Sequence, residues 1–276
     1  MVFMNGLSFL NVELTSRCNK SCWCCGRRKL EREHPELCQW GDMDYELVKE
    51  IAKQVPKGIV VQLHNNGEPL LYRGLGRVLE DFKGNIRSFN TNGKLLLERA
   101  DEIIGNLETL TVSVIENDEE GLRPGKASGL EGDEQYEIVK RFLSKKGPRK
   151  PFMVYRLLGK VDHPERWASL PGVIARRVLH SPMGSYDYQK APTIPEIGIC
   201  LDLLTHLAIN RFGHVSACVR FDPEGHLIIG DLNRDTLETI WNGKVRKHYI
   251  DCHLKGHRDW LKGCDRCEYF GIPRGE

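Results

Sequence analysis

The ten cysteines constrain this chain of 276 residues more than any other feature, because they form two widely separated groups. Five lie within the first 38 residues, none lies between residues 39 and 199, and five lie from residue 200 onward. The first residues lack the charged and apolar regions of a signal peptide, and cytoplasmic chains keep their thiols reduced. The pattern therefore predicts a cytoplasmic protein whose cysteines bind a metal or a cluster rather than form disulfides.

Charge and hydropathy exclude several partner classes. Lys and Arg total 40 against 38 Asp and Glu, a formal net charge of +2, which predicts neither a basic nucleic-acid-binding surface nor an acidic tail. No run of 18 or more apolar residues occurs, so no membrane-spanning helix is expected. We expect no nucleic acid and no membrane among its partners.

The stretch between the two cysteine groups alternates short β-branched runs with segments of helical period, about six β/α units in all. Strands are predicted at residues 9–14, 58–63, 87–90, 109–115, 152–158 and 173–179, and helices at 44–51, 73–83, 95–104, 134–144 and 163–169. Consecutive β/α units impose a parallel sheet with right-handed crossovers, and a closed eight-unit barrel needs ~250 residues. We therefore predict an α/β fold: an open (β/α)6 TIM-like barrel over residues 1–190.

Residues 191–276 are predicted to form a small α+β domain. A hairpin is expected over residues 206–221 with its turn at Gly213, then a strand at 227–229 and a helix that carries Leu237, Ile240 and Trp241 on one face. A tail of this size has only a small core of its own, so we expect metal or cluster ligation to supplement it.

The first constellation is Cys18, Cys22 and Cys25, in a loop just after the first strand. This loop lies at the carboxyl edge of the predicted barrel, where β/α-barrel enzymes place their chemistry. Three thiolates would leave one iron of a 4Fe-4S cluster open to an outside ligand. A structural zinc site would need a fourth ligand from Cys24, Cys38 or a histidine. Spacing alone favours the cluster and leaves zinc open.

The second constellation consists of two separated thiols followed by a Cys-x-x-Cys pair: Cys200, Cys218, Cys264 and Cys267. This is the layout of a closed site with four thiolates. Zinc and a 4Fe-4S cluster both accept such a set.

The Cys-x3-Cys-x2-Cys loop, followed by Asn66, Gly67, Glu68 and Pro69 after the second strand, resembles the radical S-adenosylmethionine superfamily over the first 190 residues. The resemblance implies that the open iron binds the amino and carboxylate groups of S-adenosylmethionine and that the Gly-Glu-Pro turn contacts its amino group. Asn92 and Ser113 resemble residues on the ribose side. The family usually has an aromatic residue immediately before the third cysteine. Cys24 stands there in this chain, which leaves Cys24 as an alternative to Cys25.

The pattern Cys200-x12-Gly213-x4-Cys218, with the later Cys-x-x-Cys, resembles the twitch domain, the short form of the SPASM extension in the same superfamily. That resemblance implies one auxiliary 4Fe-4S cluster for electron transfer, two clusters in all, and a reductant such as flavodoxin or ferredoxin. The layout is nearest to short members that oxidise a small-molecule alcohol such as an aminocyclitol or sugar, so we expect a radical SAM oxidoreductase.

Two other functions stay open. A peptide maturase would epimerise or crosslink a ribosomal precursor, although a first strand near residue 8 leaves no room for a leader-binding domain before it. A zinc-stapled binding protein without enzymatic activity is the other alternative. Cys38 and Cys252 are candidate catalytic hydrogen-atom donors, while simple packing is the alternative for both and for Cys24.

Overall fold

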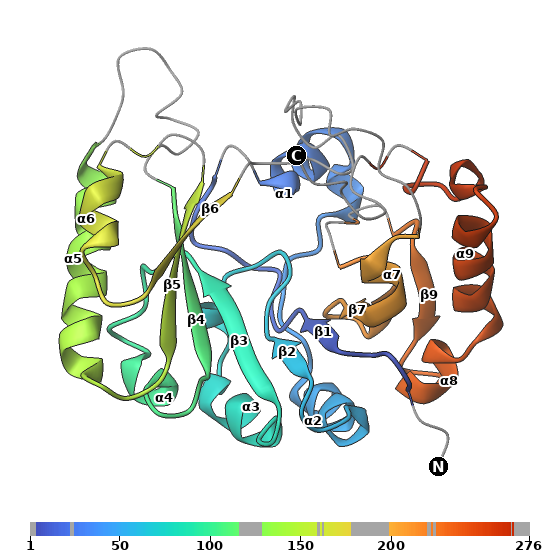
Figure 1. The fold of residues 1–276 in the computed structure, drawn as a ribbon, viewed down its shortest axis with the longest axis horizontal. Helices are drawn as coiled ribbons and strands as arrows, with labels where there is room; N and C mark the ends of the chain where they lie inside the picture. Colours follow the sequence, from blue (N-terminus) through green and yellow to red (C-terminus); the bar gives the residue numbers. More distant parts are fainter. Residues whose placement is uncertain are drawn as a thin grey trace.

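The structure is a computed structural model that describes residues 4–22, 25–115, 129–158, 161, 163–177, 199–219, 222, 225–265 and 267. Its framework is one nine-stranded sheet in the order β6-β5-β4-β3-β2-β1-β7-β8-β9 (Figure 1). The strands are β1 (Phe9–Val12), β2 (Val60–Gln62), β3 (Ile86–Thr91), β4 (Thr109–Val114), β5 (Phe152–Leu158), β6 (Val173–Arg177), β7 (His206–Ile209), β8 (His214–Ser216) and β9 (Ile228–Asp231).

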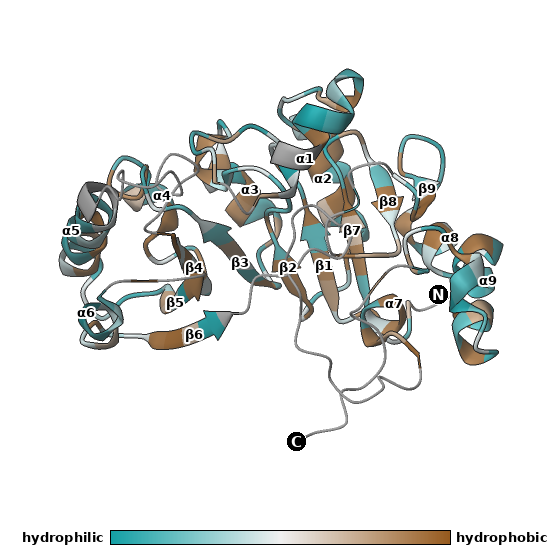
Figure 2. Cartoon of the chain, turned by 90° about the horizontal axis from the view of Figure 1, so that it is seen from above, coloured by the Kyte–Doolittle hydropathy of each residue, from teal (hydrophilic) through white to brown (hydrophobic). Residues whose placement is uncertain are grey.

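The helices lie between and around these strands. They are α1 (Gly26–Glu33), α2 (Tyr45–Gln54), α3 (Leu75–Asp81), α4 (Ala100–Ile103), α5 (Gly129–Lys146), α6 (Pro164–Ala168), α7 (Leu201–Thr205), α8 (Leu237–Trp241) and α9 (Lys244–Leu254), with 3-10 turns at Pro35–Leu37, Pro69–Leu71 and Arg258–Trp260. Seen from above, the strands form an open arc with α2, α3 and α4 on its convex side (Figure 2). Among the described helices, none is both long and apolar enough to cross a membrane.

The predicted barrel is confirmed. Strands β1 to β6 pair in parallel with their sequence neighbours, so six β/α units form an open barrel. The predicted strands match the observed ones within a few residues, and α2 begins after Asp44, whose carboxylate accepts hydrogen bonds from the N–H groups of Glu46 and Leu47. Helices α1, α7 and α9 were not predicted.

The tail continues the barrel sheet instead of forming a separate core. Strand β7 pairs in parallel with β1, with Phe9 opposite His206, and β8 and β9 add to it as antiparallel strands. Buried tail side chains such as Leu207, Leu237 and Trp241 belong to the same hydrophobic cluster as the barrel. The expectation that the tail has a small core of its own is therefore wrong. The predicted boundary at residues 190 and 191 lies outside the described residues.

The two faces of the barrel strands differ in chemistry. The face toward the helices is apolar, with Phe89, Leu110 and Tyr155 fully buried. The opposite face is polar, because register pairs such as Asn11 with Gln62 and Ser113 with Arg156 share it. The concave interior of the arc is therefore lined by hydrogen-bonding side chains.

Arg87 and Glu108 form a largely buried ion pair between the start of β3 and the residue before β4. The Arg87 guanidinium donates to both Glu108 oxygens, from Nε at 2.8 Å and from Nη2 at 2.9 Å. Burial raises the pKa of Glu108, but the hydrogen bonds from Arg87 and Lys150 outweigh that effect and lower the pKa to about 2.

Candidate functional site

The first cysteine loop lies between β1 and α1, at the carboxyl edge of the strands. The backbone N–H of Cys25 donates to the carbonyl of Cys22 at 3.0 Å, and Cys25 is the N-cap residue of α1. Cys18, Cys22 and Cys25 are only partly buried, and thiolates in such a loop are suitable ligands for iron or zinc. Cys24 lies outside the described residues.

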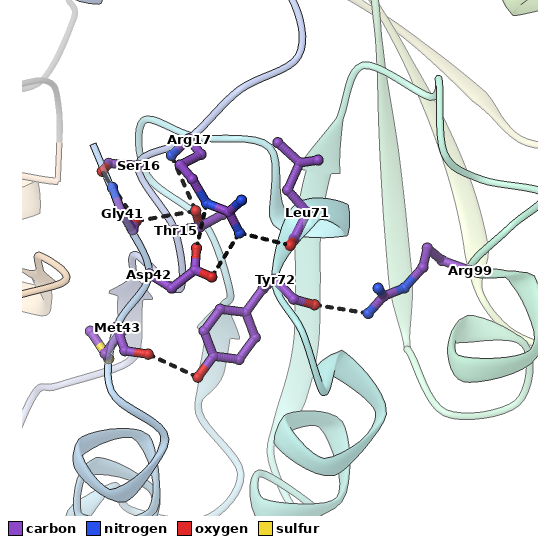
Figure 3. A network of polar contacts seen from close by, with 9 residues as sticks. All are labelled: Thr15, Ser16, Arg17, Gly41, Asp42, Met43, Leu71, Tyr72 and Arg99. Carbon is purple, nitrogen blue, oxygen red and sulfur yellow. Dashed lines mark hydrogen bonds and ion pairs between the residues drawn. The ribbon is translucent and has the colours of Figure 1, made fainter.

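A network of polar contacts fixes the chain just before Cys18 (Figure 3). Arg17 donates to both carboxylate oxygens of Asp42, from Nε at 2.9 Å and from Nη2 at 2.7 Å. The same Nη2 donates to the carbonyl of Leu71 at 3.2 Å, and Ser16 exchanges hydrogen bonds with the backbone of Gly41. These contacts tie the cysteine loop to the segments before α2 and after β2.

Gly67 explains part of the Asn-Gly-Glu-Pro motif. A β-carbon at this position would stand 2.0 Å from the carbonyl oxygen of Thr15 and 2.8 Å from that of Arg17. The next residue, Glu68, donates its N–H to the same Arg17 carbonyl at 2.8 Å. Only glycine permits this approach of the motif to the cysteine loop.

The carboxylate of Glu68 joins the ends of β2 and β3. It accepts hydrogen bonds from Thr91 Oγ1 at 2.8 Å, from the Asn92 N–H at 2.8 Å and from the Leu70 N–H at 3.1 Å. Burial raises its pKa to about 7, although these hydrogen bonds act in the opposite direction. Asn92 in turn places Nδ2 3.9 Å from Cys18 Sγ. The structure thus brings predicted residues Glu68 and Asn92 to Cys18.

Ser113 and Asn92 are held together by Gln135, a residue that sequence reasoning missed. Gln135 lies on α5, and its Nε2 donates to the carbonyl of Asn92 at 2.7 Å and to that of Ser113 at 2.9 Å. The Gln135 side chain is 7% exposed. No local pattern in α5 indicated that it reaches two strand ends.

His64 and Arg156 lie on the polar inner face. His64 Nδ1 accepts a hydrogen bond from the Asn90 N–H at 3.1 Å, which assigns the ring proton to Nε2. Burial, aided by the nearby charge of Arg156, lowers the pKa of His64 to about 3, so the ring is neutral. Arg156 was not predicted, although a charged residue in the otherwise apolar β5 sequence was the available signal.

A cavity of about 490 Å³ is lined both by Asn66, in the turn after β2, and by Cys218, from the second cysteine set. Its polar wall includes Glu13 and Asn66 at the barrel edge and Cys218 after β8, and Trp40 and Phe212 contribute apolar surface. The volume lies within the range of small-molecule sites. The cavity therefore has room for a small molecule between Asn66 and Cys218.

Glu13 is a buried carboxylate in this cavity wall that sequence reasoning also missed. One oxygen accepts from Asn66 Nδ2 at 2.9 Å and the other from the Arg211 N–H at 3.2 Å. Burial raises the pKa of Glu13 despite these hydrogen bonds. The Arg211 guanidinium donates to the Gln39 carbonyl at 2.7 Å, so the β7–β8 turn contacts the loop before α2.

The second cysteine set is assembled from three segments. Cys200 is the N-cap residue of α7, Cys218 follows β8, and Cys264 and Cys267 form a turn in which the Cys267 N–H donates to the Cys264 carbonyl. Gly213, in the predicted spacer, has φ +88° at the β7–β8 turn, a conformation that favours glycine. The glycine between Cys200 and Cys218 therefore permits the tight turn of the β7–β8 hairpin.

The thiol groups fit an iron–sulfur ligand set by their chemistry. Burial, together with the neighbouring Cys267 and Cys200, raises the pKa of Cys264 to about 12. Several thiols thus lie near one another in a partly buried position, where positively charged iron would stabilise their thiolates. Within the described ranges, no three His, Cys, Asp or Glu side chains are grouped closely enough to hold a metal ion as they stand.

The two candidate catalytic cysteines lie apart from the cavity wall. Cys252 is 4% exposed on α9, with Sγ 3.7 Å from His248 Nε2. Cys38 ends the 3-10 turn at Pro35–Leu37, where its Sγ lies 3.7 Å from the His34 carbonyl. Its neighbours Leu37 and Gln39 line the cavity. The role of Cys38 and Cys252 as hydrogen-atom donors stays a prediction.

Comparison with known proteins finds a match for the segment that contains the second cysteine set. Residues 200–268 match the SPASM family model, an iron–sulfur cluster-binding domain. The chain is 22% identical, over 98% of its length and 96% of the relative, to the S-adenosyl-L-methionine-dependent 2-deoxy-scyllo-inosamine dehydrogenase of Niallia circulans. It is 31% identical to a tungsten-containing aldehyde ferredoxin oxidoreductase cofactor-modifying protein of Pyrococcus furiosus, over 40% of this chain and only 30% of that protein.

Solved structures share the fold. The crystal structure of BtrN in complex with AdoMet and 2-DOIA has a TM-score of 0.65, with 21% identity over 95% of this chain and 92% of BtrN. Streptococcus suis SuiB bound to S-adenosylmethionine has a TM-score of 0.64, with 13% identity over 95% of this chain and 72% of SuiB.

The open barrel, the cysteine loop beside the Gly-Glu-Pro turn and the matched cluster-binding domain define an iron–sulfur enzyme of the S-adenosylmethionine-dependent class. Over almost its full length the chain is similar to members of the radical SAM superfamily, and its residues 200–268 match the SPASM domain. Its cofactors are 4Fe-4S clusters and S-adenosylmethionine.

Proposed function

We propose that this enzyme oxidises an alcohol group of a small polar molecule, such as an aminocyclitol or sugar, and that it carries two 4Fe-4S clusters. The observation that carries the proposal is the cavity of about 490 Å³ whose wall contains both Asn66, beside the first site, and Cys218, in the second. A relative that matches over almost its full length and is named as a 2-deoxy-scyllo-inosamine dehydrogenase supports it.

In this proposal the cysteine sets hold the clusters, with Cys18, Cys22 and Cys25 on the first and Cys200, Cys218, Cys264 and Cys267 on the second. The turn from Asn66 to Pro69, with Asn92 and Ser113, binds S-adenosylmethionine. With these groups bound, the first site supplies a 5'-deoxyadenosyl radical that takes a hydrogen atom, and the second accepts one electron. A small reductant such as flavodoxin or ferredoxin supplies the electron to the first site.

The protein's own residues bind the substrate and take its proton. Oxidation of a secondary alcohol to a ketone removes one hydrogen atom, one electron and one proton. Glu13 is the proposed proton acceptor, because its buried carboxylate faces the cavity and has a raised pKa. Hydrogen-bonding side chains in the wall of this cavity, among them Asn66, Asn210 and Ser216, suit a substrate with several hydroxyl or amino groups.

The alternative proposal is a peptide maturase that epimerises or crosslinks a precursor peptide. SuiB bound to its precursor peptide SuiA superposes with a TM-score of 0.59, although this chain spans 72% of SuiB. Similarity of fold at 13% identity does not distinguish a peptide from a small molecule. The reaction products distinguish them.

The test is anaerobic incubation with dithionite, S-adenosylmethionine and two substrate panels, aminocyclitols and precursor peptides, followed by mass spectrometry. A product two hydrogens lighter than an aminocyclitol, formed with 5'-deoxyadenosine, supports the proposal. A modified peptide instead supports the alternative. The Glu13→Gln variant is expected to lower the rate of product formation while its iron content stays at the wild-type value. Unchanged turnover in Glu13→Gln contradicts only the proposed role of Glu13 as proton acceptor. It does not contradict the proposed oxidation of an alcohol.

A further inference from the structure

His253 lies near the end of α9, beside the second cysteine set. Its side chain is 7% exposed. Its Nδ1 accepts a hydrogen bond from the backbone N–H of Cys200, with 3.5 Å between the two nitrogens. A ring nitrogen that accepts a hydrogen bond carries no proton, so this contact assigns the single proton of the neutral ring to Nε2.

The Nε2–H group of His253 is a buried donor with no acceptor among the residues that the structure describes. A buried donor left unpaired costs about 1–3 kcal/mol, and buried polar groups in native proteins are rarely left in that condition. The unpaired Nε2–H group therefore indicates that a bound group supplies a hydrogen-bond acceptor beside His253.

The surroundings of His253 identify the kind of acceptor. The charge of Arg258 acts on both His253 and Cys264, and Arg258 Nη1 donates to the Cys267 carbonyl at 3.0 Å. The backbone of Cys200 is bonded to the His253 ring, and Cys200 and Cys267 both act on the thiol of Cys264, so three of the four cysteines assigned to the auxiliary cluster belong to the surroundings of this short segment. Their sulfur atoms, and the sulfides of a cluster between them, are hydrogen-bond acceptors.

We infer that His253 donates a hydrogen bond from Nε2–H to a sulfur atom of the auxiliary cluster and thereby raises its reduction potential. A donor directed at a cluster sulfur stabilises the extra negative charge of the reduced state. The auxiliary cluster then accepts an electron from the substrate more readily. This inference rests on the cluster assigned to the second cysteine set and is independent of which substrate is oxidised.

The test compares a matched pair of variants, His253→Gln and His253→Met. Both side chains are unbranched and of similar length, but only glutamine carries an N–H near the position of Nε2. Each is made together with the Ala substitutions at Cys18, Cys22 and Cys25, so that only the auxiliary cluster gives a signal. The readout is a redox titration followed by electron paramagnetic resonance. His248→Met is the control, because His248 is exposed on the same helix.

The midpoint potential of His253→Met is expected to fall below that of the His253 protein, with His253→Gln restoring most of the shift and His248→Met causing none. Equal potentials in all four proteins overturn the inference. Equal shifts in the Met and Gln variants overturn it too, because they indicate packing.

A second measurement needs no substitution at His253 and decides the question if His253→Met fails to load iron. Electron-nuclear double resonance of the reduced auxiliary cluster is expected to show an exchangeable proton that disappears in D2O and a coupling to 15N-labelled histidine. Absence of both couplings overturns the inference. An iron content near zero in the triple alanine background means that the cluster assignment itself is wrong, which is a separate failure.

Discussion

Gly67 packs against the backbone of Thr15 so closely that a β-carbon on Gly67 would stand 2.0 Å from the Thr15 carbonyl oxygen. This contact joins the turn after β2 to the chain just before Cys18. The position of the first cysteine loop therefore depends on a residue 49 positions further along the sequence than Cys18.

Gly67→Ala is expected to prevent loading of the first cluster. The added methyl group would collide with backbone atoms, which cannot turn aside as a flexible side chain can, so the cysteine loop must move. Iron per chain after anaerobic reconstitution should fall from about eight to about four, since each cubane cluster holds four irons. Cleavage of S-adenosylmethionine should be lost.

Gly76→Ala is the control for this substitution. Gly76 lies in α3, where a β-carbon would meet only the flexible side chain of Glu102 at 3.4 Å. Iron content should stay at the wild-type value. A Gly67→Ala protein that keeps about eight irons and its cleavage rate contradicts the role given to this contact.

Thr91→Val should weaken both the fold and the binding of S-adenosylmethionine. It removes the hydroxyl that donates at 2.8 Å to the buried carboxylate of Glu68. Loss of one partner of a buried hydrogen bond costs about 1–3 kcal/mol. The free energy of unfolding and the Kd for S-adenosylmethionine are the measurements.

Thr109→Val is the matched control for Thr91→Val, because it makes the same substitution on the neighbouring strand β4. Thr109 lies three positions before Val112, which is the register partner of Thr91. If both variants bind S-adenosylmethionine as the wild type does, Glu68 does not depend on Thr91 for its position.

The sequence was sufficient to predict the barrel and both cysteine sets, because those features are local. Alternating apolar residues indicate strands such as β5, and the spacing of Cys18, Cys22 and Cys25 lies within one loop. Helix α1 gave no signal because it is almost entirely charged, with Leu30 its only apolar residue. Helix α9 places the charged Arg246 on its buried side, which obscures the helical pattern.

The parts that escaped prediction depend on contacts between distant segments. The pairing of β1 with β7 brings together residues almost 200 positions apart, so the tail joins the barrel core. Glu13 lines the cavity only because the β7–β8 turn places the Arg211 N–H against it. Neither contact leaves a local pattern in the sequence.

The ion pair of Arg87 and Glu108 predicts a loss of stability in acid. The pKa of Glu108 is about 2 in the folded chain against an ordinary value of 4.5. The stabilisation is therefore complete above pH ~4.5 and is lost as the pH falls toward ~2. Glu108→Gln should lower the free energy of unfolding by about 2–3 kcal/mol at pH 7.

Urea unfolding of both proteins from pH 7 to pH 3 measures this difference, which should shrink as the pH falls. Glu80→Gln serves as the control, since the pair of Glu80 with Lys83 is exposed and such pairs contribute little. A difference between wild type and Glu108→Gln that is constant across this range contradicts the assigned pKa.

The last prediction concerns the role of the auxiliary cluster. If the enzyme is a dehydrogenase, Cys264→Ser or Cys267→Ser should leave cleavage of S-adenosylmethionine intact but block product formation, because the substrate would have no acceptor for its second electron. Circular dichroism and thermal melting must accompany the assay, since small cluster-binding segments owe part of their stability to the cluster.

A well-folded Cys264→Ser protein that still oxidises substrate rules out the electron-acceptor role. The alternative function, a peptide epimerase, then requires Cys38 or Cys252 as a hydrogen-atom donor. If either Cys38→Ala or Cys252→Ala stops product formation, and solvent deuterium appears in a peptide product, the enzyme is an epimerase whose cysteine returns a hydrogen atom. Because Cys252 is buried beside His248 on α9 whereas Cys38 lies next to cavity residues Leu37 and Gln39, we expect that effect at Cys38 if it occurs.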